Sequence, residues 1–483
     1  MAQSLPPLDR RLAEEQQTFA RPLGGLVRRA PVCCAPQQTL AEVAALMRRE
    51  GVGSVVVVDA GRRPLGILTS RDMVRVVAED LAGRPVADAM SRDPVALPAH
   101  AFAYEAALAM AAHRIRHVLV LDEGRLAGVV SERDLFALER LGLAELTREL
   151  RLSDSVEKLG ALAADIRRLS ARLVEQGVAA EPLTRFVSVL NDRLSQRILE
   201  VVRRRHELSG IRWCWLAFGS EGRFEQTLAT DQDNGLVFAA HAGVEATDAR
   251  GRLLPFAREV NEVLAVCGFP LCKGNVMASN PDLCLSLEEW RRRMAGWIEA
   301  PAPKALLDAA IFFDFRGLHG DAELASDLRD WVLARAKRSP TFLRALAEAA
   351  LEARPALGRF GGFVTDDAAG TPGSINLKLQ AARIFVDAAR VLALARGLAQ
   401  TSTAERLRAA LGAQSPECAS ALRAFFLVQE LRLEAQLASV GGPAEHANRI
   451  VPERLDRVRR AALREALLIA GELQQRLALD FQL

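Results

Sequence analysis

A glycine–serine pair and a pair of aspartates lie close together near the middle of the chain. One apolar run ends at Gly219-Ser220, and a second begins directly after Asp231 and Asp233. We expect Asp231 and Asp233 to enter the second strand, where residues i and i+2 point to the same side of the sheet. Two carboxylates on one face suit Mg²⁺ or Mn²⁺, which bind a few protein oxygens together with substrate phosphates. The spacing therefore indicates metal-dependent phosphoryl or nucleotidyl transfer.

The residues around the glycine–serine turn are suited to phosphate. Gly219 lets the backbone approach a phosphate closely, and the Ser220 hydroxyl with neighbouring amides can bind the β and γ oxygens of a nucleoside triphosphate (NTP). Arg223 is a further candidate phosphate ligand. A calcium loop starting at Asp231 is excluded, because its twelfth position needs a glutamate and Ala242 stands there. We therefore expect this segment to bind an NTP.

A second pattern occurs twice in the first third of the chain. Gly-x-x-Thr/Ser-x-x-Asp includes Thr69 and Asp72 in the first copy, and Ser131 and Asp134 in the second. In both copies a helical stripe and two short apolar runs precede or contain the pattern. An aspartate at a helix start can accept bonds from both ribose hydroxyls, and the hydroxyl with the helix N-terminus favours phosphate. The alternative is that these residues only cap helices.

The repeat resembles a tandem CBS pair, and the similarity covers residues 25–140. The resemblance implies an adenine nucleotide (AMP, ADP or ATP) in the cleft between the two halves, with the two aspartates on ribose and the two hydroxyls facing phosphate. Arg116 and His117 are candidates for additional charge-assisted contacts. The resemblance also implies a homodimer.

The central segment resembles the polymerase-β-type nucleotidyltransferase superfamily, whose signature is Gly-Ser followed by Asp-x-Asp. It is most similar to a bacterial family of nucleotidyltransferases linked to CBS pairs, with a core like that of the enzymes that modify the PII protein and glutamine synthetase. The similarity continues through residues 274–281, 286–290 and 311–316 and into the C-terminal helices. It implies transfer of a nucleoside monophosphate to a small molecule or to a protein such as a PII-like signalling protein, with Asp231 and Asp233 catalytic.

The superfamily usually adds a third carboxylate. Asp314, in an apolar run, is the candidate for this catalytic position, and Glu288 and Glu289 are others. The alternative for Asp314 is a buried residue paired with Arg316. If the third carboxylate is missing, the domain would bind nucleotides without catalysis.

The elements that must position these residues indicate an α+β multidomain protein. Helical periodicity without strand signals precedes the central domain and returns after it. The predicted order is an N-terminal helical extension (1–24), the tandem CBS pair (25–140), a helical connector (141–207), the nucleotidyltransferase domain with a mixed sheet (208–340) and a C-terminal helical bundle (341–483). The connector could transmit a rotation, pair with another chain, or simply pack on the next domain.

Four basic residues interrupt the apolar stripes of the C-terminal helices: Lys378, Arg383, Arg390 and Arg406. They either face the triphosphate or are surface and ion-paired side chains.

The overall composition limits the classes of binding partner that we expect. The 63 Lys and Arg residues nearly balance the 60 Asp and Glu residues, so we expect neither nucleic acid nor an anionic membrane as partner. Seven scattered cysteines without a Cys-x-x-Cys pair favour a reducing compartment and no zinc site. Since we find no targeting or membrane-spanning run, we expect a cytoplasmic protein. Two functions remain open: a nucleotidyltransferase regulated by adenine nucleotide, or an inactive nucleotide-sensing regulatory protein.

Overall fold

The computed structural model describes residues 21–27, 29–135, 143–240, 245–302, 306, 309–358, 361–367, 371–439 and 446–483. The chain divides into two compact units, residues 1–152 and 153–483. Most of the predicted N-terminal helical extension lies outside the described residues. Among the described residues, the helices lack the length and apolar character needed to cross a bilayer.

The first unit contains two similar halves. Its helices and strands are β1 (Cys33–Cys34), α2 (Leu40–Glu50), β2 (Ser54–Val58), β3 (Pro64–Thr69), α3 (Ser70–Ala78), β4 (Ser91–Arg92), β5 (Ala96–Pro98), α4 (Ala103–His113), β6 (His117–Asp122), β7 (Arg125–Ser131) and α5 (Leu143–Leu152). In each half a short strand pairs parallel with the first strand of an antiparallel hairpin, giving sheets in the order β1-β2-β3-β4 and β5-β6-β7. This is the repeat that the sequence predicts.

Local sequence explains how these halves begin and end their helices. Helix α2 starts at Thr39, whose hydroxyl accepts from the Glu42 backbone N–H while the Glu42 carboxylate accepts from the Thr39 N–H. The helix ends at Gly51, which adopts the left-handed conformation with φ of 61°. The apolar face of α2 packs with β2 and β3 in a core that includes Val43 and Leu68.

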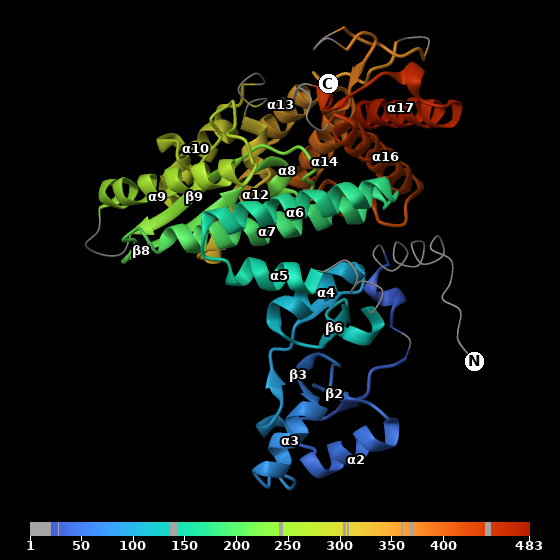
Figure 1. Ribbon diagram of the computed structural model, residues 1–483. Coiled ribbons are helices and arrows are strands. Elements are labelled where there is room, and N and C mark those ends of the chain that lie inside the picture. The colour runs from blue at the N-terminus through green and yellow to red at the C-terminus, as the bar shows by residue number, and fades with distance from the viewer. Residues whose placement is uncertain are drawn as a thin grey trace. The chain divides into compact units, whose positions relative to one another are not determined.

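The second unit contains the larger sheet and most of the helices (Figure 1). Its elements are α6 (Val156–Glu175), α7 (Ala180–Arg203), β8 (Ile211–Ala217), α8 (Gly219–Gly222), β9 (Asn234–Ala240), α9 (Ala246–Val266), β10 (Cys284–Ser286), α10 (Leu287–Glu299), β11 (Arg316–Gly320), α12 (Ala322–Lys337), α13 (Pro340–Ala350), β12 (Ile375–Asn376), the π-helix η7 (Lys378–Ala382), α14 (Arg383–Arg396), α15 (Thr403–Leu411), α16 (Pro416–Ala438), β13 (Arg449–Ile450) and α17 (Arg457–Asp480).

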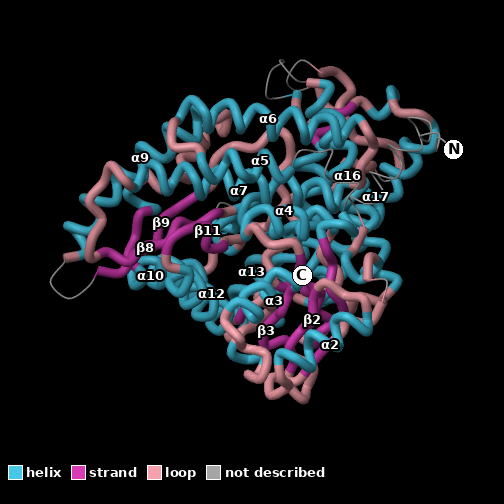
Figure 2. Tube along the Cα trace, turned by 60° about the horizontal axis from the view of Figure 1, so that its bottom comes forward, coloured by secondary structure: helices cyan, strands magenta, loops and turns pink. Residues whose placement is uncertain are grey.

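The sheet of the second unit is mixed, in the order β10-β9-β8-β11. Strands β9 and β10 are parallel, and β8 runs antiparallel to both β9 and β11. Figure 2 shows this sheet with α9 on one side and α10 and α12 on the other. The prediction of an α+β multidomain protein with a mixed sheet is confirmed.

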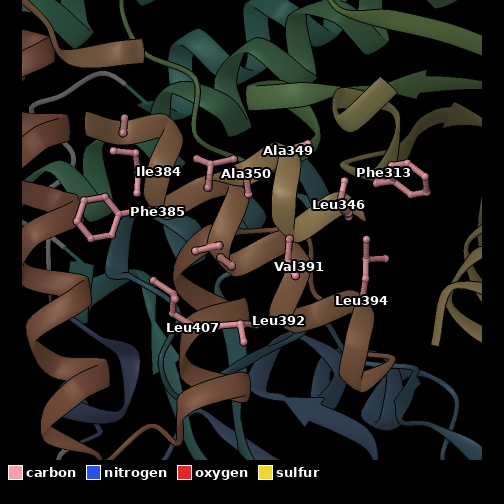
Figure 3. Close-up of a cluster of buried hydrophobic side chains, with 14 of the residues drawn as sticks. Phe313, Leu346, Ala349, Ala350, Ile384, Phe385, Val391, Leu392, Leu394 and Leu407 are labelled. Atoms are coloured by element: carbon pink, nitrogen blue, oxygen red, sulfur yellow. The ribbon is translucent and has the colours of Figure 1, made fainter. Parts of the chain in front are cut away.

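One hydrophobic core joins the sheet to the C-terminal helices. It includes Leu216 of β8, Phe313 before β11, and residues of α13, α14, α16 and α17. Figure 3 shows Leu346 and Ala350 of α13 beside Val391 of α14 in this core. The sheet and the C-terminal helices are therefore parts of a single compact unit, and the finer five-segment division stays a prediction.

Most of the predicted connector packs on the domain that follows it, whereas its first helix, α5, belongs to the first unit and contacts α4. Helices α6 and α7 lie side by side along the second unit, and α7 contacts α9, β11 and α16 (Figure 1). Of the three possibilities for this segment, simple packing on the next domain is the one that the described contacts support. Leu183, Phe186 and Leu190 of α7 are fully buried.

Candidate functional site

A cavity of about 330 Å³ lies at the end of β8 in the second unit. Four parts of the chain line it: the turn and loop between β8 and β9, Ala310 and Ile311 before β11, the π-helix η7 with α14, and α16. The lining includes predicted and unpredicted residues: Gly219, Ser220, Arg223, Glu225, Asp231, Asp233, Lys378, Arg383, Asp387, Arg390 and Arg432.

Two glycines let the chain turn tightly at the cavity. Gly219 has φ of +56°, and a Cβ there would lie 3.3 Å from Oδ2 of Asp233 and 3.1 Å from Cδ1 of Ile311. A Cβ on Gly222 would overlap the backbone carbonyl oxygen of Asp314. Both positions therefore require glycine, one for its conformation and one for its size.

Asp231 and Asp233 lie in the loop directly before β9, which begins at Asn234, so the expectation that they belong to the strand itself is wrong. The last paired residue of β9 is Asn234, and the carbonyl of Asp233 still accepts from the Phe218 N–H at 2.9 Å. The backbone N–H of Gln232 instead bonds outside the sheet, to the carbonyl of Pro270 at 3.0 Å. The Gln232 side chain is buried and donates to the carbonyls of Asn261 and Phe269, both at 2.9 Å. Its two neighbours in sequence both line the cavity, so the expected convergence of the aspartates does occur.

The two aspartates form an acidic edge without counterions. Neither Asp231 nor Asp233 has an ion pair among the described residues, whereas the other acids of the cavity do. Burial, and then the charge of Asp231, raise the pKa of Asp233 to about 6. The thiol of Cys272 hydrogen-bonds to Asp233. A carboxylate pair in this state gains stability from a cation.

The donor set is compatible with Mg²⁺. Within the described residues, no group of three or more His, Cys, Asp or Glu side chains could enclose a metal ion. Two carboxylates opening into a cavity suit an ion that completes its coordination with substrate phosphates and water, as Mg²⁺ does.

Segments that precede and segments that follow the Asp231 loop in the sequence form hydrogen bonds with this loop. From the C-terminal helices, the Thr403 N–H donates to Oε1 of Glu225 at 2.6 Å, and the Ala229 N–H donates to Oε1 of Gln436 at 3.1 Å. From α7, the Ser188 hydroxyl accepts from the backbone N–H of the residue after Glu225 at 3.0 Å. Distant segments therefore fix the geometry of this acidic edge.

The basic side of the cavity comes from Arg223 and the C-terminal helices. Arg223 donates from Nε to Glu225 at 2.8 Å and from Nη1 to Asp314 at 2.7 Å. Arg383 pairs with Asp387 at 3.1 Å, and Lys378 is exposed. Lys378 has no ion pair among the described residues and lies near enough to Asp233 to favour its charged form.

Asp314 is not placed to act as the third catalytic carboxylate. It is fully buried and does not line the cavity. Its Oδ1 accepts from Arg390 at 3.0 Å and Arg406 at 2.5 Å, and its Oδ2 accepts from Arg223 at 2.7 Å and Arg390 at 2.6 Å. Burial alone would raise the pKa of Asp314, but the charges of Arg390, Arg406 and Arg223 outweigh it and hold the pKa far below its usual range. Its oxygens are thus committed to structural ion pairs.

The other predicted partners and candidates are also accounted for. Arg316 pairs with Asp192 at 2.7 Å, so the expected pairing of Asp314 with Arg316 is wrong. Asp314 is nevertheless buried in ion pairs with arginine, as that alternative expected, but with other arginines. Glu288 is exposed beside Arg291, and Glu289 caps the start of α10 and pairs with Arg250. Neither glutamate lines the cavity.

Of the four basic C-terminal residues, Lys378, Arg383 and Arg390 line the cavity and Arg406 does not. The sequence interpretation missed Glu225, Asp387 and Arg432. A signal for Asp387 was present, because it is an acid between apolar residues of a helical run, whereas Arg432 lies between Glu430 and Glu434 and gives no such signal.

A separate cavity of about 740 Å³ lies within the first unit. It is lined by residues of both halves, including Gly53, Arg116, His117, Ser131 and Asp134. Burial lowers the pKa of His117. The cavity therefore offers both basic groups and a carboxylate to a ligand.

The two copies of the repeated pattern make the same local bonds but differ at the cavity. Oδ2 of Asp134 accepts from the Ser131 N–H at 2.8 Å and hydroxyl at 2.6 Å, and Asp72 accepts from Thr69 in the same way at 2.8 and 2.7 Å. These are the capping bonds of the alternative interpretation, and they involve Oδ2 of each carboxylate. Ser131 and Asp134 line the cavity, whereas Thr69 and Asp72 do not.

Comparison with known proteins gives matches to individual parts of the chain. Uncharacterized protein MK0525 of Methanopyrus kandleri is 32% identical over 133 residues, which are 27% of this chain and 68% of that protein. Inosine-5'-monophosphate dehydrogenase of Mycobacterium leprae is 33% identical over 142 residues, or 29% of this chain and only 26% of that enzyme. The structure titled CBS domain protein PAE2072 from Pyrobaculum aerophilum complexed with AMP is 32% identical, with a TM-score of 0.23, and covers 24% of this chain and 89% of that chain.

Family descriptions match nearly the whole described chain. Residues 23–79 and 86–140 match the CBS domain. Residues 164–304 match "Putative nucleotidyltransferase DUF294", and residues 340–481 match "Putative nucleotidyltransferase substrate binding domain". The combination of a CBS pair, a Gly-Ser turn with an Asp-x-Asp loop, and a C-terminal helical domain that completes the cavity is the one expected of a single family. The chain belongs to the CBS-linked DUF294 family of nucleotidyltransferase-type proteins.

Proposed function

We propose that the second unit is a Mg²⁺-dependent nucleotidyltransferase that transfers a nucleoside monophosphate from an NTP to a hydroxyl acceptor. The observation that carries the proposal is the pairing, across one 330 Å³ cavity, of an acidic edge without counterions and a wall of basic side chains. A magnesium triphosphate has the complementary distribution of charge, because its cation faces carboxylates and its phosphates face cations.

In this proposal, different residues of the cavity bind the metal ion and the phosphates. Asp231 and Asp233 would hold Mg²⁺, which when bound neutralises charge on the triphosphate. Ser220 and Lys378 bind phosphate oxygens, and Arg223 adds a charge-assisted contact while it stays anchored to Glu225. In the transfer, the acceptor oxygen gains a bond to the α-phosphorus as the bond to the pyrophosphate oxygen breaks, and the hydroxyl proton passes to water. Catalysis here is mainly positioning and charge stabilisation.

The second candidate is an inactive nucleotide-binding regulator. One observation favours it: the candidate third carboxylate, Asp314, is held by three arginines. This leaves two carboxylates without ion pairs in the described cavity, where the superfamily usually has three. A protein of this kind would bind NTP in the same cavity but transfer nothing.

Transfer from labelled NTP distinguishes the two functions. The full chain is incubated with Mg²⁺ and each α-labelled NTP in a cell lysate, and compared with the Asp231→Asn/Asp233→Asn variant. The control is Asp282→Asn, because Asp282 is 79% exposed and lies outside the cavity. Label transfer by wild type and control that is absent in the double variant supports the enzyme. Binding of NTP without any transfer would leave the regulator, and no binding of any NTP would refute both.

We further propose that the 740 Å³ cavity of the first unit binds AMP, ADP or ATP and changes the activity of the second unit. Oδ1 of Asp134 would accept from ribose, and Ser131 with Arg116 would face phosphate. A coupling of this kind usually amounts to about 1–3 kcal/mol. A PII-like acceptor, a homodimer and a cytoplasmic location stay predictions from the sequence.

A further inference from the structure

Arg432 of α16 is a buried cation that forms no ion pair with any residue that the structure describes. Its exposed fraction is 8%, and it lines the same cavity as Asp231 and Asp233. Its Nε donates to Oδ1 of Asn448 at 3.0 Å and its Nη1 to Oε1 of Gln429 at 2.6 Å. Nη2 has no acceptor among the described residues.

The buried arginines around Asp314 are neutralised. Arg223, Arg390 and Arg406 each form an ion pair with Asp314, whereas the contacts of Arg432 in the described part of the chain are with the neutral amides of Asn448 and Gln429. A buried charge is costly unless it is paired or bound. Burial lowers the pKa of Arg432 to about 10, which still leaves it charged at neutral pH. An anionic ligand in the cavity would therefore supply the negative charge that Arg432 lacks.

The charges that line the cavity fall into two overlapping groups. Asp233 interacts electrostatically with Asp231, Lys378 and Arg223, whereas Arg432 interacts with Arg223 and Glu225. Arg223 belongs to both groups, and Arg432 lines the same cavity as the two aspartates. An anion that contacts both groups has to be extended, as a polyphosphate is.

The backbone fixes the basic residue that lies near Asp233. Lys378 is the first residue of the π-helix Lys378–Ala382, and turns of this kind are frequent at functional positions. Oδ1 of Asn376 accepts from the backbone N–H of Lys378 at 3.1 Å and of Leu379 at 3.2 Å. Lys378 and Arg432 are therefore two cations that lack an ion pair within the described ranges, held by different helices on one cavity.

We propose that Arg432 binds the terminal phosphate of the triphosphate, with Lys378 on the phosphates nearer the aspartates, so that the cavity selects triphosphates over monophosphates. This inference rests on the proposed function and names how that site recognises its substrate. It also assigns the C-terminal domain a defined contribution, since both cations belong to that part of the chain.

Binding measured by calorimetry tests the proposal. The full chain is titrated in Mg²⁺ with the four α,β-methylene NTPs, the four nucleoside monophosphates and inorganic tripolyphosphate. Wild type is compared with Arg432→Gln and Arg432→Lys, and the matched control is Arg423→Gln, an exposed arginine on the same helix. The thermal midpoint of each variant is measured alongside.

We expect Arg432→Gln to weaken triphosphate and tripolyphosphate binding about 10- to 100-fold, as for the loss of a charge-assisted contact. Monophosphate binding should change less than about twofold, because a monophosphate does not reach Arg432. Arg432→Lys keeps the charge but loses the fork of donors, so an intermediate loss is expected. If Arg432→Gln does not fold, Arg432→Lys decides the test.

Three results would overturn the proposal: equal losses for triphosphates and monophosphates, no loss for either, or a loss of the same size in Arg423→Gln. The outcomes also separate the proposal from the function on which it rests. If wild type binds tripolyphosphate in a manner that depends on Arg432 but binds no NTP, the anion site stands and the nucleotidyltransferase assignment fails. If wild type binds NTP equally well with and without Arg432, only the inference fails.

Discussion

Replacement of Asp314 by asparagine tests whether this residue is structural or catalytic. Asp314→Asn keeps the shape of the side chain and removes the negative charge shared by Arg223, Arg390 and Arg406. Breaking a buried ion pair costs about 3–5 kcal/mol, because it leaves a buried charge uncompensated. Arg223 retains Glu225 and Arg390 retains its second acid, so only Arg406 loses its one carboxylate. We therefore expect a total loss within that single-pair range.

Urea unfolding followed by tryptophan fluorescence is a suitable assay. All 5 tryptophans lie in the second unit, so the signal reports on the part of the chain that contains Asp314. The control Asp282→Asn, at an exposed ion pair, should change the free energy of unfolding by less than about 0.5 kcal/mol. The folded-state pKa of Asp314 is depressed, so its stabilising effect is present above the ordinary carboxyl pKa of about 3.9 and declines as the pH falls below it. The difference between wild type and variant should accordingly be constant from about pH 5 to 8 and shrink in acid.

One result would refute this reasoning. If Asp314→Asn unfolds at the same urea concentration as wild type but loses nucleotidyl transfer, then Asp314 is a catalytic residue and the three arginines do not depend on it for their stability. A large loss of stability together with residual transfer in the folded fraction is the expected outcome.

Three further predictions concern single positions. Burial raises the pKa of Glu221 to about 8, so the folded state binds more protons than the unfolded state between about pH 4.5 and 8 and wild-type stability falls as the pH rises through this range. Glu221→Gln should therefore be more stable than wild type by a few kcal/mol at pH 9, and a gain in urea stability that is the same at pH 5 and 9 would contradict this. Gly222→Ala should yield little folded protein, because its Cβ meets a backbone carbonyl oxygen, whereas Gly251→Ala, with nothing within 4 Å, should raise the thermal midpoint slightly. Asp134→Asn should weaken AMP binding, measured by calorimetry, more than Asp72→Asn does, because only Asp134 lines the larger cavity; equal effects would show that the cavity is not the binding site.

The parts of the candidate site that the sequence predicts are those set by short-range geometry. Gly219 precedes Asp231 by 12 residues, and in each copy of the repeated pattern the hydroxyl residue precedes its aspartate by 3. Strand periodicity and turn chemistry are therefore enough to bring the members of each group together. Even there the strand boundary was placed too early, because the hydrogen bond of Gln232 to Pro270 depends on a segment far along the chain.

The parts that the sequence does not predict depend on long-range pairing. Arg390 and Arg406 lie 76 and 92 residues after Asp314, and an apolar run around an aspartate gives no indication of which cations will meet it. The same run is compatible with a buried ion pair or with a catalytic acid. Only the packing of α14 and α15 against the end of β11 decides between them.

The distribution of the cavity along the chain has a consequence during synthesis. The acidic edge is made early, but its basic wall and the helices that anchor its loop are translated later, up to Arg432 and Gln436. A nascent chain that has left the ribosome up to β11 contains both aspartates together with Ser220 and Arg223, but it still lacks the basic residues of the C-terminal helices. Premature termination before α16 would therefore leave fragments that lack Arg432 and the bond from Gln436 to the loop at Ala229.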